Sequence, residues 1–153
     1  MAAKAPMVAK TSLATLAVAV LLAPTAHAEP APHNDQNAVV RIVFDQPTDV
    51  PGKSMETATV SYPPGAGSAA HHHAKSAFIM AYVISGAIRS QVEGEPVRVY
   101  HAGETWSELP GAHHTISENA SATQPAELLA VFLVDTGDGP LTTDDAVSDG
   151  PPR

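Results

Sequence analysis

Hydrophobic residues in this chain fall in short runs and alternating stretches that have the length and pattern of β-strands. Six segments fit strands: residues 38–44, 56–62, 78–84, 86–92, 97–100 and 128–134. Residues 56–62 and 86–92 alternate between apolar and polar side chains, whereas 78–84 and 128–134 are continuous apolar runs suited to buried strands. The last of these runs also resembles a buried helix, but its length and its Val and Phe content favour a strand.

Turn-forming residues separate the six segments. The clearest clusters are Pro63-Pro64-Gly65, Glu93-Gly94-Glu95-Pro96 and Leu109-Pro110-Gly111. No stretch shows the spacing of a convincing amphipathic helix. Short strands at regular intervals with Gly/Pro turns predict an all-β domain, either a sandwich or a barrel.

The first 28 residues have the three parts of a secretory signal peptide. Lys4 and Lys10 give a basic start, residues 13–23 are apolar and uncharged, and Ala26-His27-Ala28 fits a cleavage site. The apolar run is too short for a membrane anchor, since a spanning helix needs about 20 apolar residues. We therefore expect a signal peptide at 1–28 that is removed, leaving a soluble periplasmic or secreted protein.

Irregular segments flank the predicted β domain. Residues 29–37 are polar and proline-rich, which predicts a flexible leader. Residues 135–153 carry five aspartates, three glycines and three prolines, which predicts a flexible acidic tail at 136–153. Leu141 could still hold part of this tail against the domain. A single domain at 38–135 remains.

The charge and the cysteine content narrow the range of partners. The formal charge of −8 becomes −10 once Lys4 and Lys10 leave with the signal peptide. Such an acidic surface argues against nucleic acid and against an anionic membrane as partners. The chain has no cysteine, so an exported domain of this size must be stabilised by its core, by a metal ion or by a partner subunit.

Five of the eight histidines fall in two clusters, residues 71–73 and 113–114. On a strand, residues i and i+2 point to the same face, so His71 and His73 can enter one cavity while His72 points outward. An imidazole from a distant strand would complete a set of nitrogen ligands for zinc, iron, copper or nickel. The alternative is an exposed histidine patch that binds metal adventitiously.

The chain resembles the small single-domain cupins in two motifs. Residues that follow the first motif, G-x5-H-x-H-x(3,4)-E-x6-G, are Gly65, His71, His73 and Gly86. Residues that follow the second motif, G-x5-P-x-G-x2-H-x3-N, are Gly103, Gly111 and His114, with Pro110 and Asn119 each one place late.

This resemblance implies a fold, a metal and a partner. The fold would be a cupin jelly-roll β-barrel of two packed antiparallel sheets. A divalent metal ion (Fe, Mn, Zn, Ni or Cu) would be held inside by His71, His73 and His114. A homodimer is expected as well, because small cupins often pair through sheet edges and pairing would cover exposed strands.

The chain departs from the cupin pattern at the metal-binding glutamate. The position expected for it falls among residues 77–79, which are all apolar. Glu108 is the candidate replacement, either as a fourth ligand or as a general base, and its alternative is a solvent-exposed carboxylate. Trp106 alternates with Glu108, so both are expected on one face.

A small organic substrate or ligand is expected in an apolar cavity. Candidate wall residues, each of which could equally be core, are Phe78, Met80, Tyr82, Ile84, Trp106 and Phe132. The leading hypothesis is a metal-dependent enzyme of dioxygenase type in which Glu108 handles protons. The alternatives are a non-catalytic metal or small-ligand binder and a barrel with a vestigial site.

Overall fold

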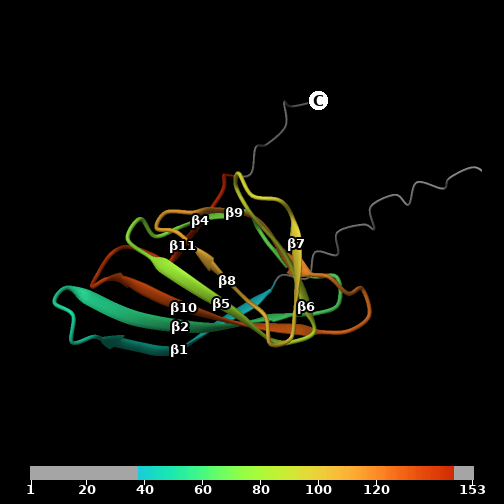
Figure 1. Cartoon of the computed structure of the whole chain (residues 1–153), viewed down its shortest axis with the longest axis horizontal. Helices are drawn as coiled ribbons and strands as arrows, with labels where there is room; N and C mark the ends of the chain where they lie inside the picture. The colour runs from blue at the N-terminus through green and yellow to red at the C-terminus, as the bar shows by residue number, and fades with distance from the viewer. Residues whose placement is uncertain (1–37, 147–153) are drawn as a thin grey trace, which may run out of the picture. The chain divides into compact units, whose positions relative to one another are not determined.

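The structure, a computed structural model, describes residues 38–146, and every regular element in that part is a β-strand (Figure 1). The predicted signal peptide and leader, and residues 147–153 of the predicted tail, lie outside the described residues. Within residues 38–146, no helix is long and apolar enough to cross a membrane. The all-β prediction is confirmed.

Two antiparallel sheets face each other across the interior, as expected for a jelly roll (Figure 1). The first sheet contains, in spatial order, β1 (Val39–Pro47), β2 (Lys53–Tyr62), β10 (Ala126–Asp135), β5 (Phe78–Ser85) and β8 (Thr105–Glu108). The second contains β11 (Thr142–Asp144), β4 (His71–His73), β9 (His113–Asn119), β6 (Ala87–Val92) and β7 (Arg98–His101), with β3 (Gly67–Ser68) paired to β9. Each of the six predicted strand segments overlaps one of these strands.

Strand β5 alternates between its two faces although its sequence is continuously apolar. Ile79, Ala81 and Val83 are buried, whereas Phe78 and Met80 are about 40% exposed on the other face. A run without polar residues carries no period-two signal, so its sequence could not show that one face lies outside. The prediction of a fully buried strand is therefore wrong for β5.

A row of alanines crosses the inner face of the first sheet. Ala130 on β10 lies opposite Ala58 on β2 and opposite Ala81 on β5, and all three are buried. Larger side chains pack above and below this row in two core clusters, one around Val83 and the other around Ile79. Because alanine fills little space, the middle of the sheet leaves room for a cavity between the sheets.

A β-bulge lies in strand β9 at Thr115. Val92 of β6 lies opposite His114, whereas the preceding residue of β6 lies opposite Ile116. The extra residue reverses the side-chain alternation beyond it, so Ser117 and Asn119 share the inward face with His114. This bulge explains why Asn119 stands one position later than the cupin motif requires.

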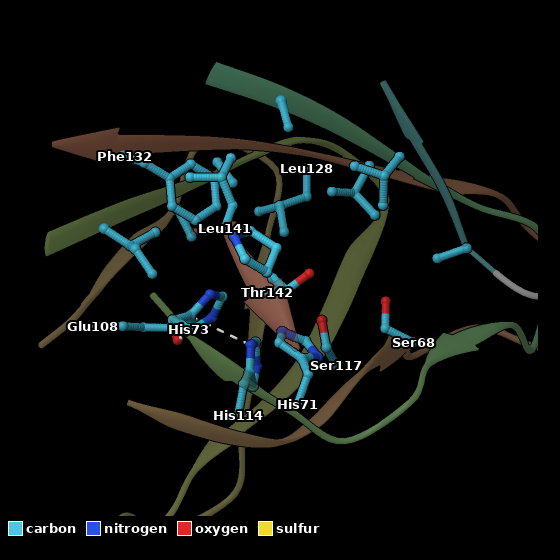
Figure 2. Close-up of a pocket in the computed structure, with 18 of the residues that line it drawn as sticks. Ser68, His71, His73, Glu108, His114, Ser117, Leu128, Phe132, Leu141 and Thr142 are labelled. Carbon is cyan, nitrogen blue, oxygen red and sulfur yellow. Dashed lines mark ion pairs between the residues drawn. The ribbon is translucent and has the colours of Figure 1, made fainter. Parts of the chain in front are cut away.

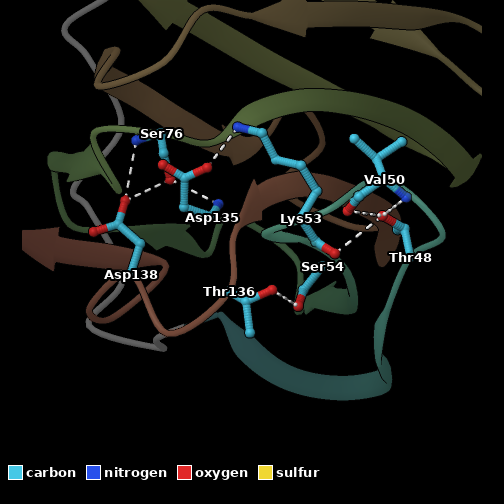
Figure 3. A network of polar contacts seen from close by, with 8 residues as sticks. All are labelled: Thr48, Val50, Lys53, Ser54, Ser76, Asp135, Thr136 and Asp138. Carbon is cyan, nitrogen blue, oxygen red and sulfur yellow. Dashed lines mark hydrogen bonds and ion pairs between the residues drawn. The ribbon is translucent and has the colours of Figure 1, made fainter.

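The C-terminal segment (residues 136–146), which was expected to be flexible, is fixed in the structure as far as it is described. Asp138 accepts hydrogen bonds from the backbone N–H and the hydroxyl of Ser76 (Figure 3). Strand β11 then pairs with β4, and Leu141 packs against the core. The folded part thus extends beyond the predicted boundary at residue 135. Backbone pairing and Leu141 hold this segment against the barrel. Of these two contacts, only the one made by Leu141 could be predicted from the hydrophobic pattern of the sequence.

Candidate metal centre

Three histidines from two neighbouring strands meet inside the barrel (Figure 2). His71 and His73 lie on β4, and His114 lies on β9 directly opposite His71. None of the three residues is more than 8% exposed. Their ring centroids lie 4.8 to 5.9 Å apart, and one nitrogen from each ring falls within 4.8 Å of the others. The arrangement could hold a metal ion.

Neighbouring groups fix the orientation of two of the rings. His71 Nδ1 lies 2.8 Å from the carbonyl oxygen of Ala69, which can only accept a hydrogen bond. His71 therefore carries its proton on Nδ1, and its Nε2 is free to bind a metal ion. His114 Nε2 lies 2.9 Å from the hydroxyl of Ser90, so its Nδ1 is the nitrogen that faces the other polar groups.

Glu108 brings a buried carboxylate to the same cluster. Its Oε2 lies 2.9 Å from His73 Nε2, and its Oε1 lies 3.4 Å from His114 Nδ1. The indole N–H of Trp106 donates a hydrogen bond of 2.9 Å to Oε1. Trp106 and Glu108 therefore share the inward face of β8, and Glu108, at 3% exposure, is not a solvent-exposed carboxylate.

Several polar atoms at the centre of the cluster have no hydrogen-bond partner within residues 38–146. They are both ring nitrogens of His73 and Oε2 of Glu108. His73 Nε2 and Glu108 Oε2 lie 2.9 Å apart, but the angles at the two atoms do not allow a hydrogen bond. Leaving buried polar atoms unpaired costs about 1–3 kcal/mol each. A metal ion bound between imidazole and carboxylate would satisfy Oε2 and one of the two His73 nitrogens.

The protonation states at neutral pH also fit a metal site. Burial lowers the pKa of His71 and lowers the pKa of His114 to about 4, so both imidazoles are neutral. Burial by itself raises the pKa of Glu108, but the imidazoles of His73 and His114 and the Trp106 N–H outweigh it, so the net pKa is lowered. Neutral imidazole and ionised carboxylate are the forms that bind divalent metal ions.

The histidine cluster lies at the wall of a cavity of about 630 Å³ (Figure 2). The alanine row and the side chains of Leu128 and Phe132 form much of its apolar lining. Its polar lining includes Tyr62 and Ser117, whose oxygens lie 2.7 Å apart. This volume suits a small organic molecule.

The structure separates the sequence-predicted candidates. It brings His71, His73, His114 and Glu108 together and leaves His72 on the outer side of the sheet. Of the proposed cavity wall, only Phe132 lines the cavity. Trp106 instead stacks on Tyr100, with ring centroids 4.5 Å apart, behind the carboxylate that it orients.

The other four candidates for the wall, Phe78, Met80, Tyr82 and Ile84, point outward, so that prediction is wrong. The structure also shows two cavity residues that the sequence reasoning missed, Tyr62 and Ser117. The alternation of residues 56–62 could have indicated Tyr62. Ser117 could not be found, because the bulge at Thr115 changes the alternation.

Comparison with known proteins shows a similarity to one family. The family described as "Cupin domain" matches residues 58–132, just under half of the chain. The crystal structure of TT1209 from Thermus thermophilus is 25% identical with a TM-score of 0.53, and the match covers 68% of this chain and 90% of that one.

Two further solved structures share the fold. One is an uncharacterized conserved protein with a double-stranded beta-helix domain from Klebsiella pneumoniae (18% identity, TM-score 0.54, 69% of this chain and 84% of that one). The other is the DMSP lyase DddQ from Ruegeria pomeroyi (17% identity, TM-score 0.58, 74% of this chain and 54% of that one). At these identities the likeness shows the fold alone. No curated protein matches the chain.

Proposed function

Because the chain carries a small cupin domain, we propose that it is an exported protein that holds one divalent metal ion and acts on a small organic molecule in the adjoining cavity. The ligands would be His71, His73 and His114, with Glu108 beside them. One observation carries the proposal: buried imidazole nitrogens and a buried carboxylate oxygen without partners converge at the wall of a mostly apolar cavity. When bound, a divalent ion supplies a Lewis acid with coordination positions for oxygen donors.

Glu108 stands in for the missing cupin glutamate. Ile79, one of the three residues among which the cupin glutamate is expected, faces inward on β5 and lies directly opposite Glu108 on β8. Directly opposite residues in an antiparallel pair have Cβ atoms about 4.5–5.5 Å apart. A carboxylate at Glu108 therefore reaches the same region from the neighbouring strand. Trp106 holds Oε1, which leaves Oε2 to complete the ligand set or to accept a proton.

The cavity defines the class of molecule that fits. Its walls are mainly apolar, and its polar groups include the histidine cluster with Glu108, Tyr62 with Ser117, and Glu56. A ligand with an oxygen donor at one end and an apolar body would place the oxygen near the histidines. A dioxygenase-type reaction with Glu108 as the proton acceptor is the activity we propose to test first.

A non-catalytic binder is the second candidate. It is favoured if Glu108 Oε2 is committed to the metal ion, because the carboxylate nearest the histidines would then be unable to move a proton. The two roles of Glu108 separate the candidates experimentally.

The test measures metal content and affinity in the chain from residue 29 to 153, produced without a histidine tag. About one metal ion per chain, lost in His73→Ala, supports the site. No metal in either protein, together with unchanged melting temperatures, would overturn it.

Two variants then separate the roles of Glu108. Glu108→Gln should lower metal affinity about 10–100-fold if Glu108 is a ligand. If Glu108 is a base, Glu108→Gln should keep the metal affinity and lower the turnover of the substrate about 10²–10⁴-fold. Glu56→Gln, the same chemical change elsewhere in the cavity lining, is the matched control.

Export and dimerisation complete the proposal. For export, we expect the mature protein to be recovered outside the cytoplasm with Glu29 as its first residue, and N-terminal sequencing checks this. For dimerisation, the outer face of β5 and its neighbours exposes a cluster of large apolar side chains that a second copy would cover. Met80→Glu, in the middle of that face, should convert a dimer to a monomer in light scattering without changing metal content.

A further inference from the structure

A second group of histidine and carboxylate side chains lies on the outer side of strands β4 and β9. His72 and His113 are directly opposite each other, and their rings stack with centroids 4.1 Å apart. Asp145, just beyond β11, places one carboxylate oxygen 2.9 Å from His113 Nε2 and the other 3.8 Å from His72 Nε2. Strand alternation separates this group from the buried triad, because His71 and His114 point inward from the same strands.

We propose that His72, His113 and Asp145 form a second metal site, on the outside of the barrel, for a divalent transition metal ion such as zinc. Two imidazoles and one carboxylate form a donor set that zinc accepts, with a fourth position open to water. Zinc with ligand bonds of about 2.0–2.1 Å in a tetrahedral site holds its ligand atoms about 3.3 Å apart. The two nitrogen–oxygen distances of 2.9 and 3.8 Å lie on either side of that value. Small rotations of exposed side chains are enough to admit the ion.

His113 has a carboxylate near each edge of its ring. Asp145 is hydrogen-bonded at 2.9 Å to Nε2, and a metal ion bound there would take the place of the proton between them. Glu93 lies 3.6 Å from Nδ1, on the opposite edge, where a proton can remain when Nε2 binds the ion. The two nearby carboxyl groups, Glu93 and Asp145, also make the surroundings negative, which attracts a cation.

The outer site would join the C-terminal segment to the barrel. The Asp145 backbone N–H donates to the carbonyl of Ala70, and Thr143 of β11 lies opposite His72. Leu141 and Thr142, in the same segment, line the cavity. An ion held by Asp145 and two barrel histidines therefore stabilises one wall of the cavity. Occupancy of the outer site would make that wall more rigid without contacting the buried histidines.

Zinc titration followed by calorimetry or equilibrium dialysis tests this proposal. We expect the unmodified chain to bind one more zinc ion per chain than Asp145→Asn or His113→Gln. Where a variant still binds that ion, its affinity should be at least about 10-fold lower. His101→Ala is the matched control, because His101 also pairs with a carboxylate on the surface, that of Glu104, but has no third ligand. The same titration on His73→Gln, which removes a buried ligand, separates the outer site from the buried one.

Hydrogen exchange gives a second readout. Zinc should slow exchange of the Thr143 and Asp145 amides in the unmodified chain and in His73→Gln, but not in Asp145→Asn. Equal zinc binding by the unmodified chain and Asp145→Asn would overturn the proposal. So would an equal loss of binding in His101→Ala, because that result indicates a diffuse histidine surface. Neither result bears on the buried site.

Discussion

Moving the buried carboxylate from β8 back to β5 tests whether Glu108 replaces the cupin glutamate. Three variants are needed: Glu108→Leu, Ile79→Glu and the double exchange. Ile79 is 1% exposed, faces the interior and lies directly opposite Glu108. A glutamate at residue 79 would therefore project into the interior beside the position of the Glu108 side chain. Because Glu108 is itself 3% exposed, its charge is poorly screened by water.

The expected magnitudes follow from these contacts. Glu108 Oε2 lies 2.9 Å from His73 Nε2, so an ion held by His73 would lie within reach of the carboxylate. Removing a group beside a metal ion typically costs about 10–100-fold in metal affinity, and Glu108→Leu should weaken metal binding by that factor. Ile79→Glu alone places a second carboxylate beside Glu108 and should destabilise the metal-free protein. The double exchange should bind the metal within about 10-fold of the unmodified protein, which makes the two changes strongly non-additive.

The assay is competition for the metal ion against a chelator of known affinity, with thermal unfolding of each metal-free variant measured in parallel. Glu108→Leu leaves the indole N–H of Trp106 without its acceptor, so this variant should lose about 1–3 kcal/mol of stability. Affinities are therefore compared at a temperature at which thermal unfolding shows every metal-free variant to be folded. If the folded double exchange binds the metal no better than Glu108→Leu, the proposed equivalence of the two positions is refuted.

Three further predictions concern stability. Metal-free protein should lose about 3 kcal/mol through His114 as the pH falls from 6.5 to 4, because His114 has a pKa of about 4 when folded and 6.5 when unfolded; urea unfolding of His114→Gln should show a smaller slope, and the slope that remains comes from His71, whose pKa burial also lowers. Asn119→Ala should cost about 2–3 kcal/mol in the same assay, since the amide N–H groups bond three backbone carbonyls, and a loss below about 0.5 kcal/mol would contradict this. Gly86→Ala should cost more than Gly94→Ala: both have positive φ, but only at Gly86 would a Cβ meet a neighbour, 2.6 Å from the carbonyl oxygen of Pro125. Equal losses in thermal unfolding would refute that comparison.

The strands could be predicted from the sequence because their evidence is local. Alternation and Gly/Pro turns place six strands, and alternation separates His71 and His73 from His72. The sequence cannot predict which side chains of a strand point inward where all of them are apolar. Residues 78–84 are all apolar, so only their pairing in space shows that half of them point away from the core.

The environment of Glu108 depends on a long-range pairing. The sequence predicts that Trp106 and Glu108 share a face, but the choice of face depends on how β8 pairs with β5. The same limit applies to the C-terminal segment. Residues 142–144 have no strand-like hydrophobic pattern, and they form β11 because β4 offers an unpaired edge.

The two departures from the cupin motifs follow one physical rule: a side chain can change its position in the sequence without leaving its place in the fold. Under the proposed function, Glu108 takes the place of the cupin glutamate from β8, because directly opposite residues of an antiparallel pair have Cβ atoms only about 4.5–5.5 Å apart. Asn119 reaches the inward face, one residue late, because the bulge at Thr115 adds one residue and reverses the alternation. Glu118 stands at the position where the motif has its asparagine. Its side chain points outward and forms an ion pair with Arg89. Spacing in a motif is therefore a consequence of strand register, and a bulge or a cross-strand exchange changes the spacing while preserving the site.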